Sequence, residues 1–440
     1  MIRVYIKQAW QAVRQNRFFS FIYVVGTASS ITMVMILSIG YLIKTKSYYP
    51  ELHRDRLFYV DQIRATTKDT VNFYAEVHMS SYKTVKECFY SLQTPEAVSA
   101  TLMQVDNLCH IRVPHTDIDR LSFTQYIDDR FWQVYQYRFI DGKPFSREEF
   151  EVGASVAVIS ESLAKELFPS GNIVGKEINV GSKGYRICGV VSDGSHVLTR
   201  SFGLLFVPYT TDAFYQDGEV DEEFMLGLFR VTILAKKRGD LNKIRTEIEE
   251  KISLYTAPLS KNISLCGQPS DVLSTTLRYG RFINQDNAFI VCGIVLLLFL
   301  MIPAMNLSNL NNSRIEKRLS ELGIRKAFGA NNKTLIVQLL VENFLLTIMG
   351  SFIGLLFAYV VITIYSVELT DSFALSFAGS SAFAKESNGL RLEMFLNVSV
   401  FGLALGFALL VNLLSAYLPA YRFCRQSIVC ALSRNTSYHK

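Results

Sequence analysis

Residues 318–330 read Arg-Leu-Ser-Glu-Leu-Gly-Ile-Arg-Lys-Ala-Phe-Gly-Ala, a short basic stretch between two long apolar segments. The neighbouring segments, 288–310 and 334–365, are each long enough to cross a bilayer, which takes about 20 apolar residues. The basic stretch is therefore predicted to lie in a loop, 311–333, that joins two membrane helices. Its positive charge indicates which side of the membrane it faces.

Two further apolar segments extend this pattern to the whole chain. Half of the 440 residues are hydrophobic, which is too many for an ordinary soluble protein and too few for a chain that lies wholly in a membrane. We predict a membrane α-helical protein with a large α+β domain, 44–287, inserted between the first and second membrane helices. The predicted membrane helices are 18–43, 288–310, 334–365 and 395–417.

Three segments rich in basic residues flank these helices. They precede the first helix, lie between the second and third, and follow the fourth, so the positive-inside rule places both termini in the cytoplasm. The domain 44–287, here called the outer domain, and a short loop, 366–394, then face outward. Because the charges flank helices and form no contiguous patch, nucleic acid is not an expected partner. The basic residues are Arg3, Lys7, Arg14, Arg17, Arg314, Lys317, Arg318, Arg325, Lys326, Lys333, Arg422, Arg425, Arg434 and Lys440.

The two ends of the chain fit this topology. Residues 1–17 have the spacing of a basic amphipathic helix, which is predicted to lie in the cytoplasmic interface. The alternative is a simple continuation of the first membrane helix. That helix is too long for a signal peptide and lacks a small-residue cleavage site, so we expect a retained anchor. Residues 418–440 are predicted to be a cytoplasmic tail.

The middle of the outer domain carries the clearest local signals. Residues 156–159 predict a strand, and Ser160 is predicted to cap a helix over 161–167. Residues 175–180 and 185–191 predict a hairpin around a turn at 181–184. Together these elements predict an α+β fold with antiparallel strands. Further strands are predicted at 57–60, 204–208 and 229–234, and a further helix at 241–254.

Four of the seven cysteines lie in the outer domain, where disulfides can form. Their spacing is irregular and fits no known disulfide framework. Both disulfides and buried free thiols therefore stay open. These cysteines are Cys88, Cys109, Cys188 and Cys266.

The chain contains no pattern typical of catalysis. It has no Gly-rich loop ending in Gly-Lys-Ser/Thr, so we expect it to bind neither ATP nor Mg²⁺ by itself and to carry no cofactor. Gly194-Ser195-His196 are sequence neighbours, which rarely form a catalytic triad. Cys109, His110 and His115 do not match a closed zinc site. The chain is predicted not to be an enzyme, and no catalytic or metal residue is assigned.

The membrane segments carry signals for helix packing. Gly350 and Gly354 form one Gly-x-x-x-Gly pattern and Gly402 and Gly406 another, and such pairs let helices approach closely. Gln338 and Glu342 lie one turn apart on the third helix. For Glu342 two interpretations stay open: a buried contact that ties the helix to the basic loop, or a side chain that reaches the lipid headgroups.

The basic stretch also has the pattern of a docking helix. Residues 313–327 favour helix, and Gly329 is a natural stop. Apolar residues among the charges would suit a groove in another protein, whereas the alternative is a solvated loop that only sets topology. The residues predicted to receive the partner are Arg318, Leu319, Glu321, Leu322, Gly323, Ile324, Arg325, Lys326, Phe328 and Gly329.

This stretch, followed by Gln338, Glu342, Gly350 and Gly354, resembles the signature of FtsX-like ABC transporter permeases. The outer segment 156–191 is similar to a MacB-like periplasmic core domain. The similar residues are Ser160-Glu161-Ser162-Leu163-Ala164, Phe168, Ile173-Val174-Gly175-Lys176 and Gly189-Val190-Val191. With the four-helix topology, the two resemblances cover nearly the whole chain.

The resemblance implies a mechanotransmission system in a bacterial inner membrane. Its coupling helix would fall on 320–330, and an inserted lobe of the outer domain near 118–224. The chain lacks the fused nucleotide-binding domain of MacB, so ATP and Mg²⁺ are expected on a separate polypeptide. Implied partners are a cytoplasmic ABC ATPase, a second permease copy or a paralogue, membrane lipids, and a periplasmic adaptor or outer-membrane channel.

The resemblance leaves two functions open. The first is export or extraction of a lipoprotein, a peptide or a hydrophobic small molecule, which the size of the outer domain favours. The second is regulation of a periplasmic cell-wall hydrolase. A membrane-anchored enzyme is disfavoured because the outer domain shows neither a nucleophile pattern nor a metal pattern.

Overall fold

The computed structural model describes residues 14, 17–69, 74–103, 107–169, 171–195, 198–212, 215, 225–278, 290, 294, 331–364 and, beyond them, 401–402, 405–406, 409–410, 413 and 417. The chain divides into two compact units. One unit contains the apolar helices and comprises 1–41, 286–365 and 392–440. The other comprises 42–285 and 366–391 and contains the outer domain.

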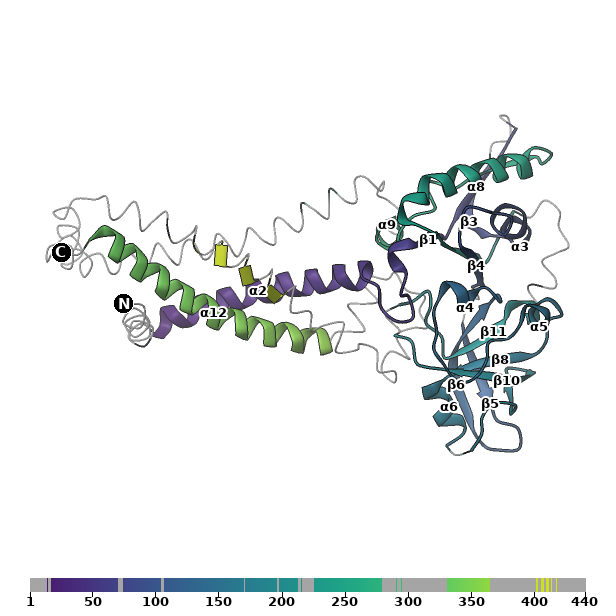
Figure 1. The fold of residues 1–440 in the computed structure, drawn as a ribbon, viewed down its shortest axis with the longest axis horizontal. Helices are drawn as coiled ribbons and strands as arrows, with labels where there is room; N and C mark the ends of the chain where they lie inside the picture. Colours follow the sequence, from purple (N-terminus) through teal and green to yellow (C-terminus); the bar gives the residue numbers. More distant parts are fainter. Residues whose placement is uncertain are drawn as a thin grey trace. The chain divides into compact units, whose positions relative to one another are not determined.

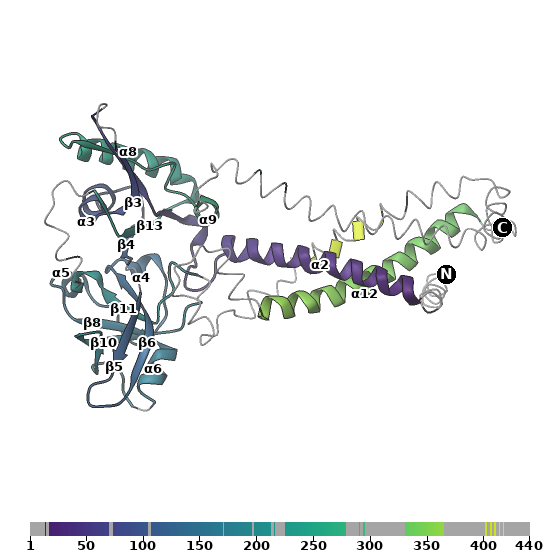
Figure 2. The same cartoon turned by 180° about the vertical axis from the view of Figure 1, so that it is seen from behind.

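Two long helices form the described part of the first unit. Helices α2 (Arg17–Thr45) and α12 (Asn332–Ile364) lie side by side in both views (Figures 1 and 2). Their segments Ser20–Ile39 and Leu340–Val361 are long and apolar enough to cross a membrane. These segments coincide with the first and third predicted membrane helices. The second and fourth fall almost wholly outside the described residues.

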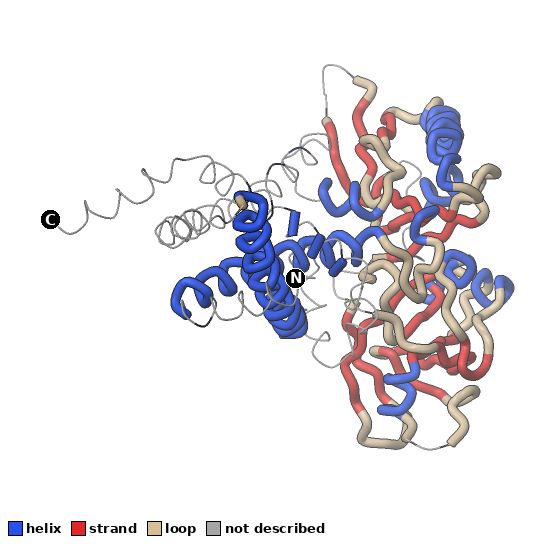
Figure 3. Tube along the Cα trace, turned by 60° about the vertical axis from the view of Figure 1, so that its left-hand side comes forward, coloured by secondary structure: helices blue, strands red, loops and turns tan. Residues whose placement is uncertain are grey.

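The outer domain is built on one long mixed sheet (Figure 3). The strand order is β11-β8-β10-β9-β5-β6-β4-β13-β3-β2-β14, and β1, β7 and β12 pair off this path with β13, β10 and β3. The strands are β1 (Leu57–Val60), β2 (Ile63–Thr67), β3 (Ala75–Ser80), β4 (Ala97–Leu102), β5 (Leu108–Arg112), β6 (Asp119–Ile127), β7 (Phe139–Gly142), β8 (Val156–Ser160), β9 (Glu177–Val180), β10 (Lys183–Val191), β11 (Leu205–Pro208), β12 (Leu226–Gly227), β13 (Phe229–Leu234) and β14 (Lys261–Ser264).

The sheet has two groups of strands that share one core. The first group contains β1–β4 and β12–β14, and the second contains β5–β11 from the intervening stretch 108–208. A single cluster of buried apolar side chains runs through both groups and includes Phe131, Phe206 and Phe229. The helices and helical turns are η1 (Arg54–Arg56), α3 (Tyr82–Thr84), η2 (Val85–Phe89), α4 (Phe131–Val134), α5 (Arg147–Glu151), α6 (Glu161–Leu167), η3 (Tyr209–Thr211), η4 (Arg238–Asp240), α8 (Leu241–Thr256) and α9 (Val272–Arg278).

The local predictions for the outer domain are confirmed for its clearest elements. Ser160 caps α6, because its Oγ accepts a hydrogen bond from the Leu163 N–H. Strands β9 and β10 form the predicted hairpin, although its loop is only Gly181 and Ser182. Gly181 has a φ of +59°, the left-handed conformation that a two-residue hairpin loop requires. Strands β1, β11 and β13 and helix α8 also lie where they were predicted.

The expectation of antiparallel strands alone is wrong for two pairs. Strand β8 pairs with β10 in parallel, and β6 pairs with β11 in parallel. Parallel neighbours require a crossover connection. Helix α6 and β9 provide it between β8 and β10, and a longer stretch from α4 to β10 separates β6 from β11. Local sequence patterns carry no information on such pairings.

Candidate functional site in the membrane helices and the outer domain

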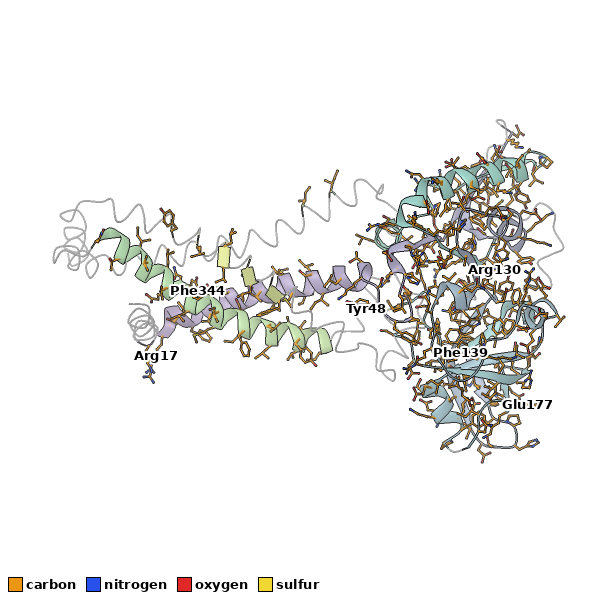
Figure 4. All side chains as sticks on the ribbon, in the orientation of Figure 1. Arg17, Tyr48, Arg130, Phe139, Glu177 and Phe344 are labelled. Carbon is orange, nitrogen blue, oxygen red and sulfur yellow. The ribbon has the colours of Figure 1, made fainter. Side chains whose placement is uncertain are left out.

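Helices α2 and α12 bury polar side chains together with apolar ones such as Tyr23 and Ile31, and they expose many large apolar side chains. On α12, Glu342 and Thr347 are 3% and 0% exposed, whereas Phe352 and Phe357 are 59% and 60% exposed. A helix on the surface of a soluble protein shows the opposite arrangement. The observed arrangement is typical of helices that pack through polar groups and face lipid. Further buried polar residues are Ser20, Thr27, Thr32, Asn343 and Ser351, and further exposed apolar residues are Phe18, Phe21, Leu356 and Phe344. Phe344 is labelled on α12 in Figure 4.

Gly350 and Gly354 lie where α12 approaches α2 most closely. A Cβ added to Gly350 would lie 2.7 Å from the Cβ of Thr27, and one added to Gly354 would lie 2.6 Å from the carbonyl oxygen of Ala28. Real side chains do not tolerate either distance. Both glycines of this pattern therefore face the same neighbouring helix of the same chain, an arrangement that their spacing permits.

A hydrogen bond crosses the same contact. The Thr32 hydroxyl lies 3.0 Å from the Gly354 carbonyl oxygen and 2.8 Å from the Ala28 carbonyl oxygen of its own helix. The bond to Gly354 is possible only because glycine lets the two backbones come close. Here the residues Thr27, Ala28, Thr32, Gly350 and Gly354 are together called the polar seam.

The structure separates the remaining predicted site residues into three sets. Glu342 is buried in the helix packing, which favours a contact within the protein over a side chain that extends to headgroups. The side chain of Gln338 and the coupling residues 318–330 lie outside the described residues. A Cβ on Gly402 or Gly406 would meet no described atom within 4 Å.

The outer domain contains a buried charged cluster that the sequence analysis did not identify. Arg200 binds Asp61 through both terminal nitrogens, Nη1 to Oδ1 at 2.6 Å and Nη2 to Oδ2 at 2.5 Å. Glu51 contacts the Nε of Arg54 at 3.1 Å. Arg230 Nε lies 3.8 Å from Asp61 Oδ1. A possible signal was the presence of charged residues on both sides of the apolar strand β1.

Burial and charge act against each other on Arg200. Burial lowers the pKa of its guanidinium, but the Asp61 carboxylate more than offsets this, so the pKa lies above its usual value. The guanidinium also lies over the Tyr59 ring, 4.1 Å from the ring centroid. Arg200 therefore stays charged and is held in one place by two kinds of contact.

A second buried carboxylate lies between strands β4 and β6. Asp128 accepts hydrogen bonds from the Ser99 hydroxyl at 2.7 Å, the Ala100 N–H at 2.9 Å and the Tyr90 hydroxyl at 2.6 Å. Burial raises the pKa of Asp128 to about 6, although these three donors favour the charged form.

Four cysteines lie among the described residues of the outer domain. The four outer cysteines are free thiols, which is one of the two alternatives, disulfides or free thiols, that their spacing left open. Burial raises the pKa of both Cys88 and Cys188 to about 12, so these thiols are inert at neutral pH. Among the described residues no group of three His, Cys, Asp or Glu side chains is placed to hold a metal ion. His196 lies outside them.

An α+β domain carried by helices with apolar outward faces defines a membrane protein with a large extramembranous domain. Two family models together match most of the chain. The MacB-like periplasmic core domain matches residues 20–251, and the FtsX-like permease C-terminal domain matches residues 293–428. The chain therefore belongs to the family of MacB/FtsX-type ABC transporter permeases, and the outer domain is its periplasmic domain.

Similar proteins include several curated macrolide export ATP-binding/permease proteins MacB. The protein from Chromobacterium violaceum is 23% identical over 328 residues, covering 73% of this chain and 45% of that protein. The one from Escherichia coli K12 is 24% identical over 263 residues, covering 59% of this chain and 38% of that protein. The chain thus spans less than half the length of these relatives.

Among solved structures, the periplasmic region of MacB from Actinobacillus actinomycetemcomitans matches with a TM-score of 0.33 and 15% identity. The match covers 50% of this chain and 92% of that structure.

Proposed function

We propose that this permease is the membrane subunit of a mechanotransmitting ABC system. A cytoplasmic ABC ATPase would move the coupling segment 318–330, and the membrane helices would carry this movement to the periplasmic domain. The work done there would be the export or extraction of a lipoprotein, a peptide or a hydrophobic small molecule. The working unit would contain a second permease, identical or paralogous, in the inner membrane.

The observation that carries this proposal is the continuity of helix α2. It runs without interruption from Arg17 to Thr45 and presents apolar side chains along its membrane segment. Only four residues after its end, Tyr49 is already bonded inside the outer domain, with its hydroxyl 2.5 Å from the Ser192 hydroxyl. A helix that enters a domain with so little linker can transmit a displacement, because it has few free backbone torsions in between.

Helix α12 is joined to α2 along the polar seam and would move with it. Close glycine packing and the Thr32 hydrogen bond oppose sliding between the two helices. Since α12 begins at Asn332, directly after the proposed coupling segment, a displacement of that segment would reach α2 through this contact. We infer four membrane helices with both termini in the cytoplasm.

The energy source is proposed to be a separate ATPase polypeptide. These 440 residues contain no P-loop, and the basic segment suits a protein partner on the cytoplasmic side. A charge reversal at Arg325 and Lys326 (Arg325→Glu, Lys326→Glu) is expected to weaken capture of the ATPase in pull-downs from the native membrane. It should also lower ATP hydrolysis by the complex.

Arg314 and Lys317 provide a matched control. They lie in the same loop, and the double variant Arg314→Glu, Lys317→Glu changes the net charge equally. It should leave ATPase capture close to wild type. Full ATPase binding by the Arg325 and Lys326 variant would refute the coupling assignment. A cell-wall hydrolase captured by the outer domain would instead favour a regulatory function.

A further inference from the structure

The segment between α2 and β2 contacts both groups of the outer domain within a few residues. Tyr49 and Pro50 are bonded to the second group: the Arg138 N–H donates to the Tyr49 hydroxyl at 2.9 Å, and the Gln136 N–H donates to the Pro50 carbonyl at 3.0 Å. Strand β1 follows and pairs with β13 of the first group. The outer end of α2 is therefore attached to both groups in turn.

Two consecutive residues of the second group hold two carboxylates of this segment. Arg200 binds Asp61 at the end of β1, as described above. The neighbouring Ser201 hydroxyl donates to Glu51 Oε1 at 2.8 Å, and the Ser201 carbonyl accepts from the Tyr137 hydroxyl at 2.6 Å. Here Glu51, Asp61, Arg200 and Ser201 are together called the bracket.

The carboxylates of the bracket are buried, and their contacts require a defined geometry. The side chains of Glu51 and Asp61 are 1% and 7% exposed. A buried carboxylate that loses its partner is costly, so these contacts resist opening far more than surface ion pairs do. The two terminal nitrogens of Arg200 also fix the orientation of the Asp61 carboxylate relative to the guanidinium, which a lysine cannot reproduce. Asp61 additionally contacts Arg230 of β13, which links the bracket to the first group.

We propose that the bracket makes the second group of strands follow the outer end of α2. Arg200 and Ser201 are then positioning residues for transmission: with the Tyr49 and Pro50 contacts, they couple 108–208 to a displacement that reaches the first group through β1. The role of this coupling in transmitting an ATPase-driven movement rests on the proposed function. The coupling itself is a property of the outer domain and can be measured without nucleotide.

The test measures two distances by electron spin resonance in the full chain, reconstituted in lipid nanodiscs. Spin labels are introduced as non-canonical amino acids, so that the native cysteines stay. One label replaces the exposed Lys46 just after α2. The second label replaces either Val152, within 108–208, or Leu254 on α8, outside that stretch. The side chains of Val152 and Leu254 are 78% and 73% exposed. The variant is Arg200→Lys with Ser201→Ala, which retains the buried positive charge.

In the wild type we expect a single narrow distance for both label pairs. In the variant the pair Lys46 and Val152 should lose its single narrow distance, while the pair Lys46 and Leu254 keeps it. Arg56→Lys is the matched control, because Arg56 binds Glu96 at 2.9 Å and the Ala235 and Lys236 carbonyls, all outside the second group. This control should leave both distances narrow.

Two results would overturn the proposal. One is an unchanged distance between Lys46 and Val152 in the variant. The other is a loss of both narrow distances, because the bracket would then stabilise the domain as a whole without directing movement. A failure of the proposed function would appear elsewhere, as a wild-type chain that captures no ATPase.

Discussion

At the scale of single residues, Asp128 shows how the outer domain joins its two groups of strands. Its carboxylate binds Ser99 and Ala100 on β4 and Tyr90 after η2, while Asp128 itself follows β6. Three donors converge on one buried carboxylate, and each donor would be left unpaired if the oxygen atoms were removed. The group therefore specifies how β4 and β6 meet.

This residue also predicts a pH dependence of stability. Because the folded pKa of Asp128 is raised to about 6, above the usual value of 3.8, the folded state binds the proton more tightly than the unfolded state. The resulting stabilisation is present below pH 4 and is lost as the pH rises through 6, and it amounts to about 3 kcal/mol. Urea unfolding of the detergent-solubilised chain, followed by Trp132 fluorescence after Trp10→Phe, would measure it.

The pH dependence of the wild type is compared with that of the variant Asp128→Asn. This variant should lose that part of the pH dependence, and it should be less stable at pH 7 by about 1–3 kcal/mol, because the amide NH₂ faces a donor. Asp55→Asn, at an exposed position of the same domain, should keep the wild-type profile. Equal pH profiles for the wild type and Asp128→Asn would contradict the assignment.

At the scale of elements, the polar seam predicts which positions of α12 tolerate a large side chain. Gly354→Leu places a side chain where even a Cβ lies 2.6 Å from the Ala28 carbonyl oxygen. The helices must separate and the Thr32 hydrogen bond is lost, which should lower stability by about 2 kcal/mol or more. The midpoint of unfolding in detergent measures this. Phe357→Leu introduces the same residue on the exposed face and should be nearly neutral.

Local patterns predicted the elements whose signals lie within a few residues of each other. Ser160 with its helix, the hairpin at Gly181 and the apolar strand β1 are of this kind. Strand β3 was not predicted, although its sequence Ala-Glu-Val-His-Met-Ser alternates apolar and polar residues; four of its six residues are exposed. The bracket was also missed, because Asp61 and Arg200 are 139 residues apart and only the folded chain brings them together.

The spacing of glycines predicted close helix packing but not its partner. Gly350 and Gly354 could equally have faced another subunit, and only the structure assigns them to α2 of the same chain. Glu342 is similar, because its burial depends on neighbours that its own helix does not reveal. In both cases the residue type indicates that a contact exists, whereas tertiary packing decides with which element.

At the scale of the whole molecule, the two units differ in what they bury. The outer domain has one large apolar core, as expected of a domain in water. The described part of the membrane unit buries hydroxyls and amides beside apolar side chains, and it exposes many large apolar side chains. The division between the two units falls between residues 41 and 42, inside α2.

The native cysteines allow a direct test of this topology. Cys266 is exposed in the outer domain, whereas Cys88 and Cys188 are buried with raised thiol pKa values and should not react. A membrane-impermeant maleimide should therefore label Cys266 in intact spheroplasts of a Cys109→Ser background, and Cys266→Ser should remove that signal. Cys424 and Cys430, in the predicted cytoplasmic tail, should react only after permeabilisation. Labelling of the tail in intact spheroplasts would invert the proposed orientation, and with it the assignment of 318–330 to a cytoplasmic ATPase.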